Sequence, residues 1–358
     1  MTLPTDKYVP TLAVRASELN ALEQLPAKSK DRLRPLFLLA PWATANTLEK
    51  AIGRIEKAYP KRPYFLDLDR DYQIPEPSNN VQEELKTLYD PSNAYENWRS
   101  FIEIHPFAQP CIQLSQQAAP DLMLQINHAQ TLGREFCIRI EHGREPDNLD
   151  TLVAVLNSLG TADYAIILEG GWTEDPLSLS LWFLGLLNGT LNDIDANVPI
   201  VVSCTSMLKG FTDIETHANI TFSNRELVQQ IAAQTNRNTV LYGDWGSTRP
   251  RVRQGGGQRP VDRIDYPTEN SWFIARDKDA GWTFKEAAQE VLSQPNIWNG
   301  KLNIWGEHMI SQTAINPAFA INTPQKNVAA RVNIHLHLQA FYGYGGLDRI
   351  NFDEDWED

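Results

Sequence analysis

Eight short apolar runs, each separated from the next by a segment with helical spacing, constrain the fold of this chain more than any other feature. The runs are rich in β-branched and aromatic residues and read YVPTLAV, RPLFLLAP, RPYFLDLD, QPCIQLS, EFCIRIE, DYAIILE, VPIVVSCT and NTVLYGD. Near-continuous apolar strands that alternate with amphipathic helices are typical of a parallel sheet covered by helices. Eight such units predict an α/β fold, a closed (β/α)8 TIM-like barrel, and an open doubly wound sheet is the alternative.

The pattern changes at about Tyr266. We expect residues 1–265 to form the barrel, and residues 266–358 to form a C-terminal α+β extension that packs on it and ends in the acidic tail NFDEDWED. A chain of 358 residues has room for both, because barrels of about 250 residues often fold as one unit. The segment from His335 to Tyr344 is apolar enough to fill the barrel mouth, which would make the protein a scaffold.

The charge balance and the apolar segments limit the partners of the chain. A formal net charge of -13 disfavours tight non-specific binding to nucleic acid, which needs clustered Lys and Arg. The opening MTLPTDKYVP lacks the features of a signal peptide. The longest apolar run, LSLSLWFLGLLNG, is shorter than the roughly 20 residues of a membrane span and predicts a buried helix. Cys111, Cys137 and Cys204 lie in apolar runs without metal-ligand spacing, which suggests a reducing compartment. We expect a cytoplasmic protein that does not bind membranes.

Polar residues follow the apolar runs at the point where each predicted strand ends. The carboxyl ends of the strands of a barrel meet at one mouth, where active sites form. Because side chains alternate along a strand, the following pairs each share a face: Asp67 with Asp69, Arg139 with Glu141, Gln113 with Ser115, Ser203 with Thr205, and Tyr242 with Asp244. The sequence therefore predicts a cluster of carboxylates at the barrel mouth.

Several buried carboxylates are stable together only when a cation or shared protons offset their charge. Asp67 and Asp69 are candidate ligands of a divalent metal such as Mg²⁺. The candidate catalytic acids or bases are Glu141, Glu169 and Asp244, and Arg139 is a candidate ligand-binding residue. The structural alternative is that these residues cap helices and form internal salt bridges.

Three tryptophans, Trp42, Trp172 and Trp245, each come just after a predicted strand. If all three surround the barrel mouth, their flat rings can stack on a base or a sugar or pack against a partner protein. Each one alone is more often a residue that covers the edge of the core. Together they favour binding of a ligand or a partner.

The segment VLYGDWGSTRPRVRQGGGQRP places arginines and glycines directly after the eighth predicted strand. Barrels commonly bind phosphate at this position, and arginines form charge-assisted bonds with anions. The segment matches neither the GxGxxG nor the GxxxxGK[ST] motif, so an alternative is that it pairs with acids of this protein or of an acidic partner. The candidate anion-binding residues are Arg249, Arg251, Arg253 and Arg259.

Two further patterns could carry chemistry. His335 and His337 in NIHLHLQ share one face of a predicted strand, but no third ligand stands near them in the sequence. Glu307 and His308 form no HExxH motif. We expect structural roles for all four residues.

Four segments, in order along the chain, resemble the beta protein family of satellite-phage and anti-phage defence loci: YVPTLAVRASELNALEQLPAKSKDRLRPLFLL, VLYGDWGSTRPR, ENSWFIAR and NIWGEHMI. In this family the first strand often carries a lysine after its YVP-type opening, whereas this chain has LAVRAS, with Arg15 as the nearest cation. The resemblance implies a role in phage defence or toxin control. The family protein would act beside a toxic or growth-blocking protein partner, encoded in the same locus, and would restrain it.

Two main hypotheses follow. The first is a component of a phage-defence or toxin-control module that acts by binding a partner protein, with a small anionic ligand in the barrel mouth as a signal. The second is a metal-dependent hydrolase of a phosphorylated or nucleotide substrate that uses the carboxylates at the strand ends.

Overall fold

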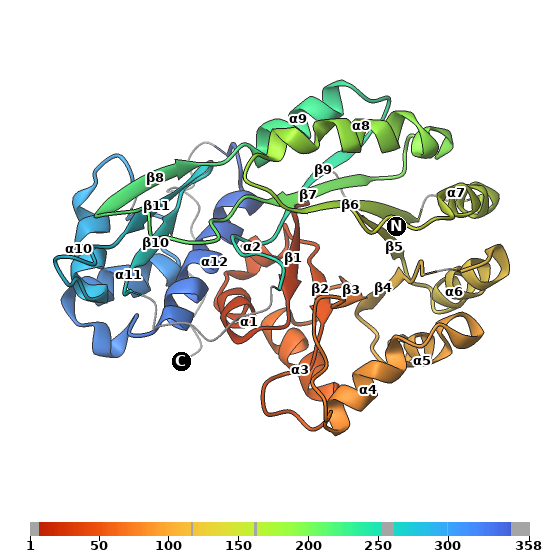
Figure 1. Cartoon of the computed structure of the whole chain (residues 1–358), viewed down its shortest axis with the longest axis horizontal. Coiled ribbons are helices and arrows are strands. Elements are labelled where there is room, and N and C mark those ends of the chain that lie inside the picture. The colour runs from red at the N-terminus through yellow and green to blue at the C-terminus, as the bar shows by residue number, and fades with distance from the viewer. Residues whose placement is uncertain (1–6, 116, 161–162, 252–260, 299, 345–358) are drawn as a thin grey trace.

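The computed structural model describes residues 7–115, 117–160, 163–251, 261–298 and 300–344 (Figure 1). Eight parallel strands close into a barrel in chain order. They are β1 (Val9–Ala13), β2 (Leu36–Leu39), β3 (Tyr64–Leu68), β4 (Ala108–Ile112), β5 (Phe136–Glu141), β6 (Tyr164–Trp172), β7 (Ile200–Thr205) and β9 (Val240–Asp244). The predicted (β/α)8 barrel is confirmed over the open sheet, because β1 pairs with both β2 and β9.

Helices cover the outside of the barrel (Figure 1). They are α1 (Ala16–Glu23), α2 (Ala27–Lys30), α3 (Glu49–Ala58), α4 (Asn80–Leu88), α5 (Ser92–Glu103), α6 (Ala119–Thr131), α7 (Leu149–Ser158), α8 (Ser180–Asn188) and α9 (Asn224–Ala233), with the 3-10 turns η1 (Pro176–Leu179) and η2 (Thr190–Asp193) beside α8. The strands have helices on one side and the barrel interior on the other. This explains why nearly every strand residue is buried and why the strands read as continuous apolar runs.

Apolar side chains fill the barrel interior. One buried cluster takes at least one residue from every strand: Val9, Leu36, Leu38, Phe65, Cys111, Cys137, Ala165, Ile167, Val201, Leu241 and, directly after β9, Trp245. Two residues further along several strands, the same face carries a polar layer, which consists of Thr11, Asp67, Arg139, Glu169 and Ser203. The polar side chains of the barrel interior therefore lie toward the carboxyl ends of the strands, where the strand-end pattern predicts them.

A smaller antiparallel sheet lies beside the barrel (Figure 1). Its strand order is β10 (Ile264–Pro267), β11 (Ser271–Ala275) and β8 (His217–Thr221), and it packs with α10 (Phe284–Ser293), α11 (Trp305–Ile315) and the 3-10 turn η3 (Pro317–Phe319). We call this unit the small lobe. Because β8 lies between β7 and α9 in sequence, the small lobe includes a segment from well before residue 265.

The last described helix, α12 (Pro324–Ala340), packs on α1 and α2 and also contacts α11 and β10. Arg225 of α9 donates hydrogen bonds to the side chain and the carbonyl of Gln339, both at 2.9 Å. The helix therefore completes the outer ring of the barrel between α9 and α1, and it does not fill the mouth. The prediction of a strand at His335 and His337 is wrong, since both residues lie in α12. Every residue of this helix from Ala329 to Ala340 is buried, so this part lacks the 3.6-residue apolar period of a surface helix.

The longest apolar run forms α8, which lies on the surface. Phe183 and Leu187 are buried against the barrel, but Leu181 is 83% exposed, so the prediction of a buried helix is wrong for the outer face. Within the described residues, no helix has both the length and the apolar character to span a bilayer. The three cysteines are free and buried, as their apolar surroundings predict.

Candidate ligand-binding site

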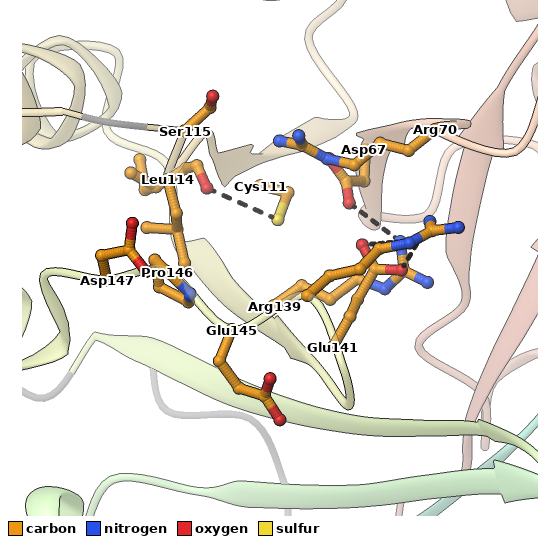
Figure 2. Close-up of a pocket in the computed structure, with 12 residues that line it drawn as sticks. Asp67, Arg70, Cys111, Leu114, Ser115, Arg139, Glu141, Glu145, Pro146 and Asp147 are labelled. Carbon is orange, nitrogen blue, oxygen red and sulfur yellow. Dashed lines mark hydrogen bonds and ion pairs between the residues drawn. The ribbon is translucent and has the colours of Figure 1, made fainter.

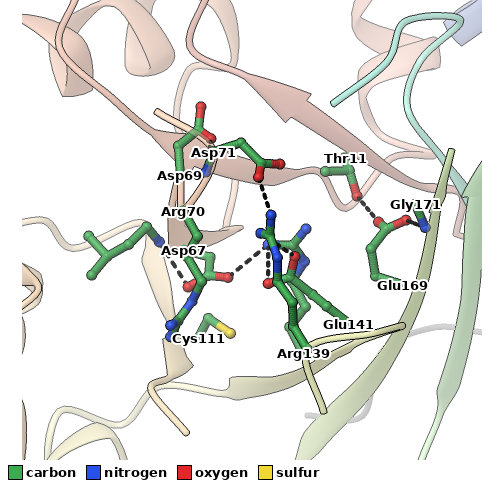
Figure 3. Close-up of polar contacts among 12 residues, drawn as sticks. Thr11, Asp67, Asp69, Arg70, Asp71, Cys111, Arg139, Glu141, Glu169 and Gly171 are labelled. Carbon is green, nitrogen blue, oxygen red and sulfur yellow. Dashed lines mark hydrogen bonds and ion pairs between the residues drawn. The ribbon is translucent and has the colours of Figure 1, made fainter. Parts of the chain in front are cut away.

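A chain of ion pairs crosses the barrel mouth (Figure 3). Arg139 of β5 lies 3.2 Å from Asp67 of β3 and 3.4 Å from Glu141. Arg144 in the loop after β5 lies 3.5 Å from Glu141 and 2.5 Å from Asp71. Each of these three acids thus has an arginine partner, which gives the arrangement that the structural alternative predicts.

The two candidate metal ligands are also paired with arginines and amides. Asp67 is buried and accepts hydrogen bonds of 2.8 Å from the Gln113 side-chain amide and from the Leu68 backbone. Asp69 is buried and lies 2.5 Å from Arg251, which follows β9. Among the residues that the structure describes, no group of three or more His, Cys, Asp and Glu side chains is arranged to hold a metal ion. The geometry of these two acids is that of internal ion pairs.

Glu169 of β6 is held inside the mouth by four donors. Its carboxylate accepts hydrogen bonds from Trp245 Nε1 at 2.9 Å, the Gly171 backbone at 2.8 Å, the Ser203 hydroxyl at 3.0 Å and the Thr11 hydroxyl at 3.4 Å. Side chains and backbone from β1, β6, β7 and the loop after β9 therefore meet at one buried carboxylate. The hydrogen bond from Trp245 connects the interior of the barrel to the loop after β9, which carries Arg249 and Arg251.

Glu141 is the candidate acid with a side chain open to a cavity. The cavity has a volume of about 220 Å³, and Figure 2 shows Arg139 and Glu141 on one wall and Ser115 and Asp147 on the opposite one. Burial raises the pKa of Glu141 above its usual value, and Arg139 offsets part of this effect. Of the three candidate acids and bases, Glu141 therefore has the geometry best suited to exchange a proton with a bound molecule.

Asp244 does not join the other acids at the mouth. Gly243 faces the interior, where an added Cβ would lie 2.9 Å from Val201 and 3.0 Å from Ser203, so Tyr242 and Asp244 face the helices. Asp244 accepts hydrogen bonds from Tyr242 at 2.7 Å and from Tyr8, and it lies 2.7 Å from His335 of α12. Burial alone would raise the pKa of Asp244, but His335 and the two hydroxyls outweigh it and hold that pKa below its usual value. Asp244 thus links the barrel wall to α12.

The three candidate tryptophans have different surroundings. Trp245 is buried in the interior cluster. Trp172 donates a hydrogen bond of 2.8 Å to the Met207 carbonyl, and the Lys209 ammonium lies 3.3 Å from its ring centre. Trp42 is half-buried, with the Arg54 guanidinium 5.0 Å from its ring centre. Trp245 therefore lies in the barrel interior and is not part of an exposed rim.

The loop after β9, which carries Arg249 and Arg251, lines a second, larger cavity of about 660 Å³ between the barrel mouth and the small lobe. Among the described residues, five arginines line it: Arg15, Arg249, Arg251, Arg263 and Arg331. We call this cavity the arginine cleft. Two of the four predicted anion-binding residues, Arg249 and Arg251, are in its wall, and the other two, Arg253 and Arg259, lie outside the described residues.

Three arginines of the cleft were not among the predicted site residues. Arg15 lies in the loop after β1, so its place after a strand end is a signal that the sequence provides. Arg263 precedes β10, and Arg331 lies in α12. Nothing in the local sequence of these two residues indicates that the small lobe turns them toward the barrel mouth.

Comparisons with known proteins match the sequence over nearly its whole length. The sequence profile of the family described as Beta protein matches residues 8–341, from the start of β1 to the end of α12. The chain is also 25% identical to Protein beta of Enterobacteria phage P4 over 363 aligned positions, which cover 98% of this chain and 97% of the phage protein. The matched region includes the barrel, the small lobe and the arginine cleft. The chain therefore belongs to the Beta protein family.

Proposed function

We propose that this protein is a component of a phage-defence or toxin-control module, which acts by binding a partner protein and is gated by a small anionic ligand at the barrel mouth. The observation that carries the ligand part is Arg249. Among the described residues its guanidinium has no carboxylate partner, although it lines a cavity of about 660 Å³. The cavity wall also carries Glu18 and Asp71, but these carboxylates pair with Arg15 and Arg144. A half-buried cation without a carboxylate partner favours an anion as its partner.

The pairing of the acids favours a binding site over a metal-dependent hydrolase. Asp67, Asp69, Asp71 and Glu141 each lie within 3.5 Å of an arginine. A metal ion would have to displace these arginines or share their carboxylates, and both cost interaction energy. An anionic ligand, in contrast, meets a surface that already presents guanidinium groups.

The partner part of the proposal rests on membership of the Beta protein family and on the likeness to a phage P4 protein. The small lobe offers a surface for such a contact. Ile315 at the end of α11 and Phe319 in η3 are 70% and 84% exposed. Apolar side chains at this exposure gain most when another protein covers them. We place the partner on this part of the small lobe.

Co-expression with the products of neighbouring genes tests the proposal. We expect the tagged wild-type protein to co-purify with one of these products and to relieve its toxicity. The double variant Ile315→Glu, Phe319→Glu should lose this complex, because charges replace the apolar contact. Leu181→Glu on α8 is the matched control, since Leu181 is 83% exposed but lies on the barrel, and it should retain the complex. The proposal fails if no neighbouring product binds the wild type and gene deletion changes neither toxicity nor phage plating.

A further inference from the structure

The arginine cleft draws its walls from segments that are far apart in the sequence. Arg15 comes from the loop before α1, Arg249 from the loop after β9, and Arg263 from the residues just before β10. The loop between β7 and β8 adds Leu208 and Phe211. In Figure 1 α12 lies between the small sheet and β1. A molecule bound in the cleft would therefore contact both the barrel and the small lobe.

Among the described residues, four of the five arginines in the cleft form ion pairs with carboxylates of this protein. The fifth is left to pair with an added anion. Arg15 lies 3.2 Å from Glu18, Arg251 lies 2.5 Å from Asp69, and Arg263 lies 2.8 Å from Asp265. Arg249 has no such partner among the described residues. Burial, and then the positive charges of Arg15 and Arg263, lower the pKa of Arg249. An anion placed among these three guanidinium groups would relieve their repulsion.

The other wall of the cleft is apolar and partly aromatic. Met207, Leu208 and Phe211 line it, and the last two are only half-buried. The guanidinium carbon of Arg263 lies 3.6 Å from the ring centre of Phe211, so the positive charge and the ring form one surface. Flat heterocycles stack on surfaces of this kind, as nucleic acid bases do on aromatic rings and on arginine.

The size and the charge of the cleft limit the class of ligand further. A volume of about 660 Å³ is in the range of roughly 300–1,000 Å³ of small-molecule sites. A net charge of -13 on the whole chain disfavours an extended polyanion, whereas a local group of arginines still suits a compact one. The ligand class that combines several negative charges with one flat ring is a nucleoside polyphosphate.

We propose that the arginine cleft binds a nucleoside polyphosphate, with its phosphates on Arg249, Arg15 and Arg263 and its base against Leu208 and Phe211. The inference rests on the proposed function in so far as it takes the cleft as the site of the anionic signal. It adds the class of ligand and the residues that recognise each part. The ligand would contact both the barrel and the small lobe. Its binding would therefore affect the small lobe, which carries the surface on which we place the partner.

Isothermal titration calorimetry of the full chain tests the inference with five probes: ATP, GTP, adenosine, inorganic tripolyphosphate and a 5′-phosphorylated oligonucleotide. We expect a nucleoside triphosphate to bind wild type more tightly than tripolyphosphate or adenosine does. Arg249→Gln should weaken this binding by roughly 10- to 100-fold, the usual loss for one charge-assisted contact. Arg62→Gln is the matched control, because Arg62 precedes β3 and so lies at the opposite end of the barrel, and it should bind like wild type. Leu208→Ala should weaken binding of the triphosphate but not of tripolyphosphate.

Each contrary result removes a different part of the inference. Equal binding of tripolyphosphate and nucleotide would overturn the ligand class and leave the anion site of the proposed function standing. Unchanged affinity in Arg249→Gln would overturn the location of the site. Tighter binding of the oligonucleotide would replace the free nucleotide by a nucleic acid end. If no probe binds wild type, the inference and the anionic signal both fail, whereas the co-purification experiment still decides on the partner.

Discussion

Replacement of Arg139 by methionine is expected to lower the free energy of unfolding by about 3–5 kcal/mol, the usual cost of removing one member of a buried ion pair. Arg139 is buried and lies 3.2 Å from Asp67 and 3.4 Å from Glu141. Methionine fills a similar volume, so the loss comes mainly from the carboxylates that remain. Of the two, Asp67 is the more affected, because Glu141 keeps its contact with Arg144. Urea unfolding monitored by circular dichroism measures the change.

Two variants separate this effect from a general loss of charge. Arg62→Met removes a half-buried arginine that lies 2.7 Å from the exposed Asp31, and it should cost less than about 1 kcal/mol. Adding Asp67→Asn to Arg139→Met should recover part of the loss, because the amide no longer carries a buried charge. If Arg139→Met costs no more than Arg62→Met, the ion pairs do not hold the barrel mouth together.

Acidification from pH 7 to pH 4 should weaken the attachment of α12 through His337. This side chain is buried in α12, with Nδ1 3.0 Å from the Ser29 hydroxyl, and burial lowers its pKa to about 4. In the unfolded chain the pKa of a histidine is about 6.5, so between these two values the unfolded state binds a proton that the folded state does not. Stability from this group is complete above about pH 6.5 and is lost as the pH falls to 4. The difference of about 2.5 pH units corresponds to about 3 kcal/mol.

The comparison with His337→Gln isolates this contribution. Glutamine can keep a hydrogen bond with Ser29 but does not titrate, so the variant should lose less stability than wild type over this pH range. The comparison is needed because burial raises the pKa of Glu18, Asp69 and Glu141, which changes stability with pH in the opposite direction. Free energies of unfolding are measured in urea at pH 7, 5.5 and 4. Parallel pH profiles for the two proteins would show that His337 does not sense acid.

The sequence predicted the barrel because both faces of each strand are buried, and this leaves the same apolar signal in all eight runs. It also predicted that Asp67, Arg139, Glu141 and Glu169 meet at the mouth, since strand ends converge in a barrel. It did not show that Asp244 faces outward. A shared face for Tyr242 and Asp244 follows from strand geometry, but the choice of face depends on Gly243 and its close neighbours across the barrel.

The small lobe and α12 were harder to predict for a different reason. β8 and β11 are about 50 residues apart in sequence, and no local pattern records their pairing. The alternation in NIHLHLQ resembles a strand because a helix buried on all sides needs no polar face. Arg263 and Arg331 reach the arginine cleft only through this long-range packing, so only the structure shows them beside Arg249.

If a ligand in the arginine cleft controls the binding of a partner on the small lobe, the affinity for the partner must differ with and without the ligand. The partner's Kd is measured for wild type and for Arg249→Gln, each with and without a saturating nucleoside triphosphate. A ligand that favours one of two states of the protein must change the Kd of the partner, by roughly 5- to 150-fold in typical cases. This change should be absent in Arg249→Gln. A wild-type Kd that is the same with and without bound nucleotide would contradict the account.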